Sequence, residues 1–283
     1  MSVAHRARRA ENVTRKAASN SALEFLERVG YVVRGTLYST MGTLALGVAL
    51  GIGGAATDQS GSLVILTRGP FGKFLLLAVA IGISAYAVWG FVRAIFDPLH
   101  RGDDAPGVAQ RLGFAWSGFA YTGLALFALQ LFAGTGGAGG QDSTHATIAA
   151  VLNHPAGQLA TVLIGLVALA AGIGQFVEAY RAEFKKDMKR GEMSKGEKEI
   201  VDTLGRLGMI ARGVTFSLVG WFVLEAGLHH DSSRAHGFGA AFLFLLNQPF
   251  GRQLLALVAL GFIALGLHSF ACARWVRLLG SKA

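Results

Sequence analysis

The chain has 283 residues, of which 52% are hydrophobic and only 15% are charged, and its formal net charge is +9. Because a soluble domain normally carries about 25% charged residues, this composition argues against a soluble globular protein. The positive charge does not indicate nucleic-acid binding, since no basic stripe is interleaved with aromatic residues. The single cysteine, Cys272, excludes an intrachain disulfide and a cysteine-rich metal site.

The first 27 residues are polar and basic, and we expect them to lie near anionic lipid headgroups at the cytoplasmic face. Six apolar segments follow, at residues 29–52, 72–93, 112–133, 157–179, 207–228 and 252–276. Each has about the 20 residues that are needed to cross a bilayer. Backbone groups inside a membrane must satisfy their own hydrogen bonds, so each segment is expected to be a helix. The sequence therefore predicts an all-α integral membrane protein with six transmembrane helices.

One sequence pattern occurs three times along the chain. It opens with two glycines five residues apart, and the pairs are Gly30 and Gly35, Gly113 and Gly118, Gly208 and Gly213. An aromatic residue follows each pair three residues later, at Tyr38, Tyr121 and Phe216. The second half of each copy has a proline, then a phenylalanine 21 residues later, at Phe91, Phe176 and Phe270. The repetition predicts three tandem helical hairpins about a pseudo-threefold axis along the membrane normal.

These hairpins divide the chain into repeats and connections. Repeat 1 spans residues 28–98, repeat 2 spans 112–181 and repeat 3 spans 207–277. The connections 99–111 and 182–206 lie between them, and a tail, 278–283, follows. Of the 26 Lys and Arg residues, 22 lie in the N-terminal segment, these connections, the tail or the helix ends beside them. By the positive-inside rule, both termini and both connections are expected in the cytoplasm.

The outer connections share a short apolar stretch just before a turn that contains Gly and Pro. The three stretches are Ser62–Leu66, Thr147–Leu152 and Ala240–Leu246. We expect them to form brief helices that lie on the outer leaflet.

The repeated pattern resembles a bacterial membrane family catalogued as domain of unknown function 1206. The residues that carry the resemblance are Gly30, Arg34, Gly35 and Tyr38, their counterparts Gly208, Arg212, Gly213 and Phe216, the segment from Ala85 to Trp89, Phe91, Asp97-Pro98, and the run from Gly172 to Arg181. The resemblance covers nearly the whole chain. It implies three two-helix repeats in a bacterial cytoplasmic membrane, and it implies no activity.

Polar residues differ between the repeats where the packing residues agree. Gly47, Gln130 and Glu225 occupy equivalent positions, and Gln175 and His268 lie near the inner ends of later segments. Ionisable groups inside a membrane are costly, so such positions are candidates for function. We expect Gln130, Glu225, Gln175 and His268 to line an axial path in a channel or transporter-like bundle. Alternatively, Glu225 reaches water or His229 and His268 is a hydrogen-bonded packing residue in a closed, non-catalytic scaffold.

Arg34, Arg212 and Glu178 form a second candidate set. The two arginines are placed where the apolar segments begin, and reaching towards lipid phosphate explains them simply. The alternative is a buried ion pair with Glu178, which would be a structural clamp.

Five of the eight histidines fall in the outer connections, at positions 145, 154, 229, 230 and 236, together with Asp142 and Asp231. Imidazole and carboxylate groups suit zinc, nickel or copper, but the spacings match no compact ligand motif. A metal site, a pH sensor and an ordinary polar loop all stay open.

No catalytic set occurs, because no serine has a His and an Asp in a triad-like context and no His-Glu-x-x-His motif is present. We expect neither enzymatic activity nor a cofactor. Helix packing is expected at small residues: Gly35, Gly42, Gly118, Gly213, Gly220 and Gly261.

Overall fold

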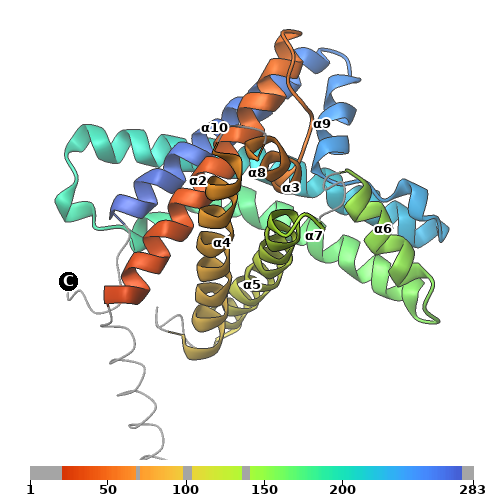
Figure 1. Ribbon diagram of the computed structural model, residues 1–283, viewed down its shortest axis with the longest axis horizontal. Helices are drawn as coiled ribbons and strands as arrows, with labels where there is room; N and C mark the ends of the chain where they lie inside the picture. Colours follow the sequence, from red (N-terminus) through yellow and green to blue (C-terminus); the bar gives the residue numbers. More distant parts are fainter. Residues whose placement is uncertain (1–20, 68–70, 98–103, 136–140, 276–283) are drawn as a thin grey trace, which may run out of the picture.

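The computed structural model describes residues 21–67, 71–97, 104–135 and 141–275 (Figure 1). Within these residues the secondary structure is entirely helical. The long helices are α2 (Ser21–Leu50), α4 (Gly72–Phe96), α5 (Ala105–Phe132), α7 (Gly157–Arg181), α8 (Lys195–His229) and α10 (Gly251–Trp275). The short α-helices are α3 (Gln59–Leu66), α6 (Gln141–Leu152) and α9 (Phe238–Leu246). Single 3₁₀ turns are η1 (Glu183–Asp187), η2 (Arg190–Glu192) and η3 (Ser232–Arg234).

Five helices are long and apolar enough to cross a membrane, namely α4, α5, α7, α8 and α10. The remaining predicted span is α2, which is long enough but less apolar, because Arg34 and the polar run Tyr38-Ser39-Thr40 interrupt it. A sixth crossing therefore stays a prediction, although α2 packs against α4 and α10.

Helix α8 begins well before the apolar segment that predicted it. Ser194 caps the helix by accepting a hydrogen bond from the Glu197 N–H, and the Glu197 carboxylate accepts one from Ser194 N. This reciprocal capping satisfies backbone donors that would otherwise lack partners, so the helix can start in the charged connection. Residues 195–206 consequently extend α8 beyond its apolar run.

The most extensive helix contacts join different repeats. Helix α4 packs on α5, α7 packs on α8, and α10 packs on α2. The same residue pair recurs at each interface: Gly118 lies against Phe91, Gly213 against Phe176, and Gly35 against Phe270. The two halves of the repeated sequence pattern therefore meet, and each glycine lies against a phenylalanine ring of another helix pair. Small residues allow this close approach.

Contacts within the repeats are less uniform. Helix α2 packs on α4 and α8 packs on α10, whereas α5 and α7 make little contact with each other. The packing order is thus α5, α4, α2, α10, α8, α7. Helices α5 and α7 stand at the two ends of this order, and they are also the least buried of the five candidate spans.

Short helices occur at all three places predicted for them, as α3, α6 and α9. Asp58 begins α3 by accepting a hydrogen bond from Gly61 N at 2.9 Å. Burial raises the pKa of Asp58, and the backbone hydrogen bonds partly offset this. In Figure 1, α9 lies beside the N-terminal end of α10 and α6 lies along α7, in agreement with their contacts.

Candidate functional site

The residues predicted to line an axial path do not come together. Glu225 lies near the outer end of α8, whereas His268 is buried near the opposite end of α10. Gln130 is exposed near the end of α5, and Gln175 is partly buried on α7. These four side chains belong to separate environments, so no continuous lining forms from them.

His268 behaves as a packing residue. Its Nδ1 lies 3.2 Å from the Val201 carbonyl, and its ring meets Phe184 edge to face at 4.9 Å between centroids. The Cys272 Sγ lies 3.5 Å from Nε2. These contacts hold α10 against α8 and the η1 turn.

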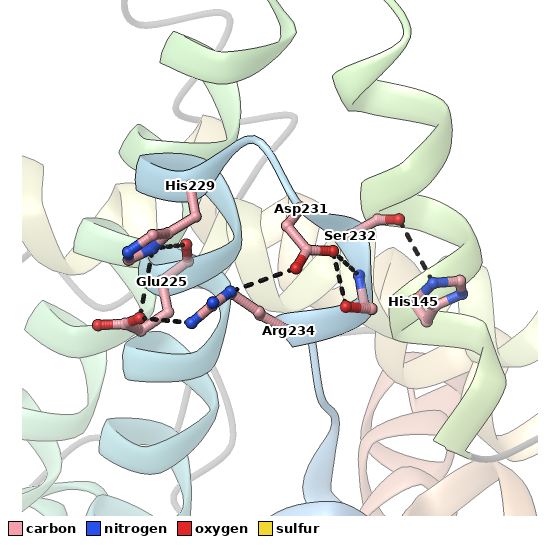
Figure 2. A network of polar contacts seen from close by, with 7 residues as sticks. His145, Glu225, His229, Asp231, Ser232 and Arg234 are labelled. Atoms are coloured by element: carbon pink, nitrogen blue, oxygen red, sulfur yellow. Dashed lines mark hydrogen bonds and ion pairs between the residues drawn. The ribbon is translucent and has the colours of Figure 1, made fainter.

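Glu225 belongs to a polar network at the outer end of α8 (Figure 2). Its carboxylate lies 3.4 Å from both the Arg234 guanidinium and His229 Nδ1. Arg234 also pairs with Asp231, whose carboxylate accepts two hydrogen bonds from Ser233. The hydrogen bonds from Ser233, followed by the Arg234 charge, lower the pKa of Asp231. The network therefore fastens the η3 turn onto α8.

An open groove of about 440 Å³ adjoins this network. Its walls are apolar, with Trp221, Leu243 and Phe244 among them, and Glu225 and Arg234 stand at its polar edge. Because those two charges already pair with each other, the groove offers a ligand no uncompensated charge.

The outer histidines converge only in part. His145 on α6 reaches Ser232 at 3.4 Å, which joins α6 to the Glu225 network, while His236 packs on Phe222. Residues 141–143 are helical, but the Asp142 side chain lies outside the described part. Among the described residues, no group of three His, Cys, Asp or Glu side chains could hold a metal ion.

A second polar cluster lies inside the helix bundle, centred on Arg34. Its Nη1 donates a 2.7 Å hydrogen bond to the Tyr86 hydroxyl. The guanidinium also lies over the rings of Tyr38 and Tyr86, at 5.4 and 5.7 Å from their centroids. Its Nε is buried and has no hydrogen-bond partner. Helices α2 and α4 thus place a cation among tyrosines.

Tyr121 extends this cluster to α5. Its ring meets that of Tyr86 at 4.6 Å between centroids, and Tyr31 meets Tyr86 from the other side at 5.8 Å. The Tyr121 hydroxyl is buried without a partner at hydrogen-bonding geometry. It lies within electrostatic range of both Arg34 and Arg212.

Arg212 brings α8 into the same cluster. Its guanidinium lies 5.1 Å from the centroid of Phe216, one helical turn along, which repeats the relation of Arg34 to Tyr38. The Arg212 Nε is also buried without a partner, and Tyr38 lies in the field of both arginines. We call Arg34, Tyr38, Tyr86, Tyr121 and Arg212 the inner cluster.

The inner cluster lies deep along the helices rather than at a helix start. Tyr86 is fourteen residues after the first residue of α4 and ten before the last. At a rise of about 1.5 Å per residue, it is about 21 Å from one end and about 15 Å from the other. Arg34 and Arg212 lie thirteen and seventeen residues into α2 and α8. Both helices begin before their apolar segments, so neither arginine stands at a helix start, although each lies five residues into its apolar segment.

The ion pair expected between these arginines and Glu178 is not among the contacts of the described residues. Glu178 instead accepts a 2.7 Å hydrogen bond from Phe184 N, beyond the end of α7, where the chain turns through Ala182. No carboxylate forms a salt bridge with Arg34 or Arg212 within residues 21–67, 71–97, 104–135 and 141–275.

The two arginines were predicted from the sequence as candidate residues, but Tyr86 was not predicted as the partner of Arg34. Tyr38 and Tyr121 appeared only as repeat positions. One signal was available: four of the five tyrosines of the chain belong to this region, at positions 31, 38, 86 and 121. Their convergence depends on how α2, α4 and α5 pack, which their spacing along the chain does not give.

The six glycines that were predicted for packing all lie against neighbouring helices. Gly42 faces the backbone of α10 at Ala259 and Ile263, Gly220 faces α7 at Leu169, and Gly261 faces Ala211. Gly35, Gly118 and Gly213 make the phenylalanine contacts described above.

Comparisons with known proteins agree with the repeat architecture. The family described as Domain of Unknown Function (DUF1206) matches the chain three times, at residues 29–97, 112–182 and 207–276. The chain is also similar to an uncharacterized protein, YxxB, of Bacillus subtilis (strain 168), with 35% identity over 242 residues, which cover 86% of this chain and 87% of that protein. No solved structure matches. The three matches cover most of the chain and coincide with the three helix pairs, and the chain therefore belongs to the DUF1206 family.

Proposed function

We propose that this protein is a transporter-like helix bundle that carries an ion or small solute, with the inner cluster as its binding site. The observation that carries the proposal is a pair of arginines, Arg34 and Arg212, five residues inside the apolar segments of α2 and α8 and without a carboxylate partner among the described residues. A charged side chain at such a depth costs several kcal/mol and is retained where it serves a function. Both arginine side chains are partly exposed rather than fully enclosed by the described residues.

The proposal includes the arrangement in the membrane. Both termini face the cytoplasm, the three hairpins are related by a pseudo-threefold axis, and the protein resides in the cytoplasmic membrane of a bacterium. The 22 basic residues expected on the inner side, including those of the first 27 residues, contact anionic lipid headgroups. The protein carries no catalytic step and no cofactor.

A closed scaffold is the second candidate, and one observation favours it. Met41, Phe262 and Leu265 are fully buried and fill the space between α2 and α10. A bundle that is packed in this manner throughout would hold helices together without passing a solute.

A flux assay separates the two candidates. The full chain is reconstituted into phospholipid vesicles loaded with a panel of inorganic anions, organic acids, cations and neutral solutes, and the loss of each is followed. We expect at least one solute to leave faster than from protein-free vesicles. Arg34→Gln is expected to slow that loss about tenfold, the change that about 1.4 kcal/mol produces in a rate.

Arg206→Gln is the matched control, because Arg206 is an exposed arginine on the cytoplasmic extension of α8. It removes the same charge and is expected to leave the flux unchanged. If no solute in the panel leaves faster than from protein-free vesicles, the transporter proposal fails and the closed scaffold is favoured.

A further inference from the structure

We infer that the inner cluster binds an oxyanion, a phosphate or carboxylate group held between Arg34 and Arg212. The inference rests on the proposed function, since it names the class of solute for the same site. It can nevertheless be tested by binding alone.

The charge balance of the cluster points to an anion. Gly35 and Ala211, the chain neighbours of the two arginines, lie against Gly266 and Gly261 of α10, and both arginines act on Tyr38 and Tyr121, so two positive charges share one region of the bundle. In a low-dielectric interior, like charges repel strongly and each charge loses its hydration. An anion between them compensates both charges, a neutral solute compensates neither, and a cation adds to the repulsion.

The hydrogen-bonding groups of the cluster point the same way. Arginine has five donors and no acceptor. The Nε atoms of Arg34 and Arg212 are buried without partners, and the buried Tyr121 hydroxyl lies beside that of Tyr38. The Tyr86 hydroxyl accepts from Arg34, which leaves its proton available for donation. A ligand that supplies several acceptors would satisfy these groups at once.

The tyrosines form a built site rather than a surface patch. Tyr38, Tyr86 and Tyr121 are 3%, 8% and 6% exposed, and they come from α2, α4 and α5. Their rings are fixed by mutual edge contacts and by the Arg34 guanidinium. The hydroxyl groups are therefore held in place before a ligand arrives.

The planar guanidinium groups favour an oxyanion over a halide. A guanidinium presents paired N–H groups that match two oxygens of one carboxylate or phosphate. Such a group could come from a free small anion or from the headgroup of an anionic phospholipid.

A thermal-shift titration tests the inference. The full chain, purified in a non-ionic detergent, is titrated with inorganic phosphate at constant ionic strength, with chloride as the replaced anion. We expect a saturable rise in Tm of roughly 5 °C at phosphate concentrations far above Kd. Arg34→Gln and Arg212→Gln are expected to abolish the rise, and Arg206→Gln is expected to preserve it.

Tyr121→Phe keeps the inference testable if the arginine variants do not fold. It removes one hydroxyl and keeps the buried ring, so we expect a stable protein whose apparent Kd for phosphate is raised about tenfold, the equivalent of losing one hydrogen bond to a charged ligand.

Native mass spectrometry of the purified protein identifies the source of the oxyanion. A retained anionic phospholipid that Arg34→Gln removes and Arg206→Gln does not would assign a lipid headgroup. A lipid-free protein with a saturable phosphate response would assign a free anion. The inference is overturned if no anionic lipid is retained and phosphate leaves Tm unchanged, or if the arginine variants respond as the unaltered protein does.

The binding result and the flux result can fail separately. Phosphate binding without flux of any solute would retain the oxyanion site and reject transport. Flux of a cation or a neutral solute without phosphate binding would retain transport and reject the oxyanion.

Discussion

Asp202 and Arg34 show how a charged side chain is accommodated at two depths in one protein. Asp202, on the charged N-terminal extension of α8, pairs with Arg190 at 2.6 Å and with Lys185 at 2.8 Å. Arg34, inside the bundle, has a tyrosine hydroxyl and two aromatic rings instead of a carboxylate. The first arrangement neutralises charge within the chain, whereas the second leaves the Arg34 charge without a carboxylate partner among the described residues.

The Asp202 contacts make the stability of the charged connection between α7 and α8 depend on pH. Partial burial acts to raise the pKa of Asp202, but hydrogen bonds from Arg190 and Lys185 outweigh it and lower the pKa. A carboxyl whose pKa is lowered in the folded protein stabilises it at a pH above its unfolded pKa, about 4, and loses this contribution as the pH falls further.

We therefore expect Asp202→Asn to destabilise the protein by about 1–3 kcal/mol at pH 7, since hydrogen bonds to charged groups contribute in this range. At pH 3 the difference from the unaltered protein should shrink. Thermal unfolding in detergent at both pH values measures this, and Glu199→Gln, an exposed site on the same helix, is the control. Equal destabilisation at pH 7 and pH 3 would show that the ion pairs are not its cause.

At the scale of helices, close packing depends on where a glycine lies rather than on how many there are. A Cβ at Gly220 would lie 2.6 Å from the backbone nitrogen of Leu169, whereas a Cβ at Gly174 meets nothing within 4 Å. Both glycines belong to the α7 and α8 pair. The sequence alone does not distinguish them by composition, because both sit in apolar runs.

Gly220→Ala is expected to force α7 and α8 apart and to destabilise the protein by about 1–3 kcal/mol, the usual cost of overpacking. Gly174→Ala should be neutral or stabilising by up to about 1 kcal/mol, because alanine favours the helix. The Tm of each full-length variant in detergent tests this pair. Equal Tm values for the two variants would show that Gly220 does not lie in a tight interface between α7 and α8.

At the scale of the whole molecule, the repeats predicted the helix pairs and the places of α3, α6 and α9. Periodicity and length suffice for this because each hairpin must satisfy its backbone inside a membrane. The joining of α4 to α5, α7 to α8 and α10 to α2 was not predicted, since it depends on which repeats become neighbours. The inner cluster was missed because it depends on packing: Tyr86 reaches Arg34 across the contact of α2 with α4, and Tyr121 joins through the contact of α4 with α5.

The orientation of the whole molecule can be tested by labelling single cysteines. Replacing Cys272 by Ala removes the only cysteine, so Arg206→Cys and Ser233→Cys can each be added to that background. In intact bacterial cells, a membrane-impermeant maleimide should label Ser233→Cys, and it should label Arg206→Cys only after permeabilisation. The reverse pattern would contradict the orientation expected from the basic residues.

The occupancy of the inner cluster is tested most directly by an experimental structure of the full chain, determined in a lipid bilayer with phosphate present. We predict an anion, free or as a lipid headgroup, within hydrogen-bond distance of the guanidinium groups of Arg34 and Arg212 and of the Tyr121 hydroxyl. A structure in which either arginine instead pairs with a carboxylate of the chain, or in which apolar side chains fill the space between them, would contradict the account.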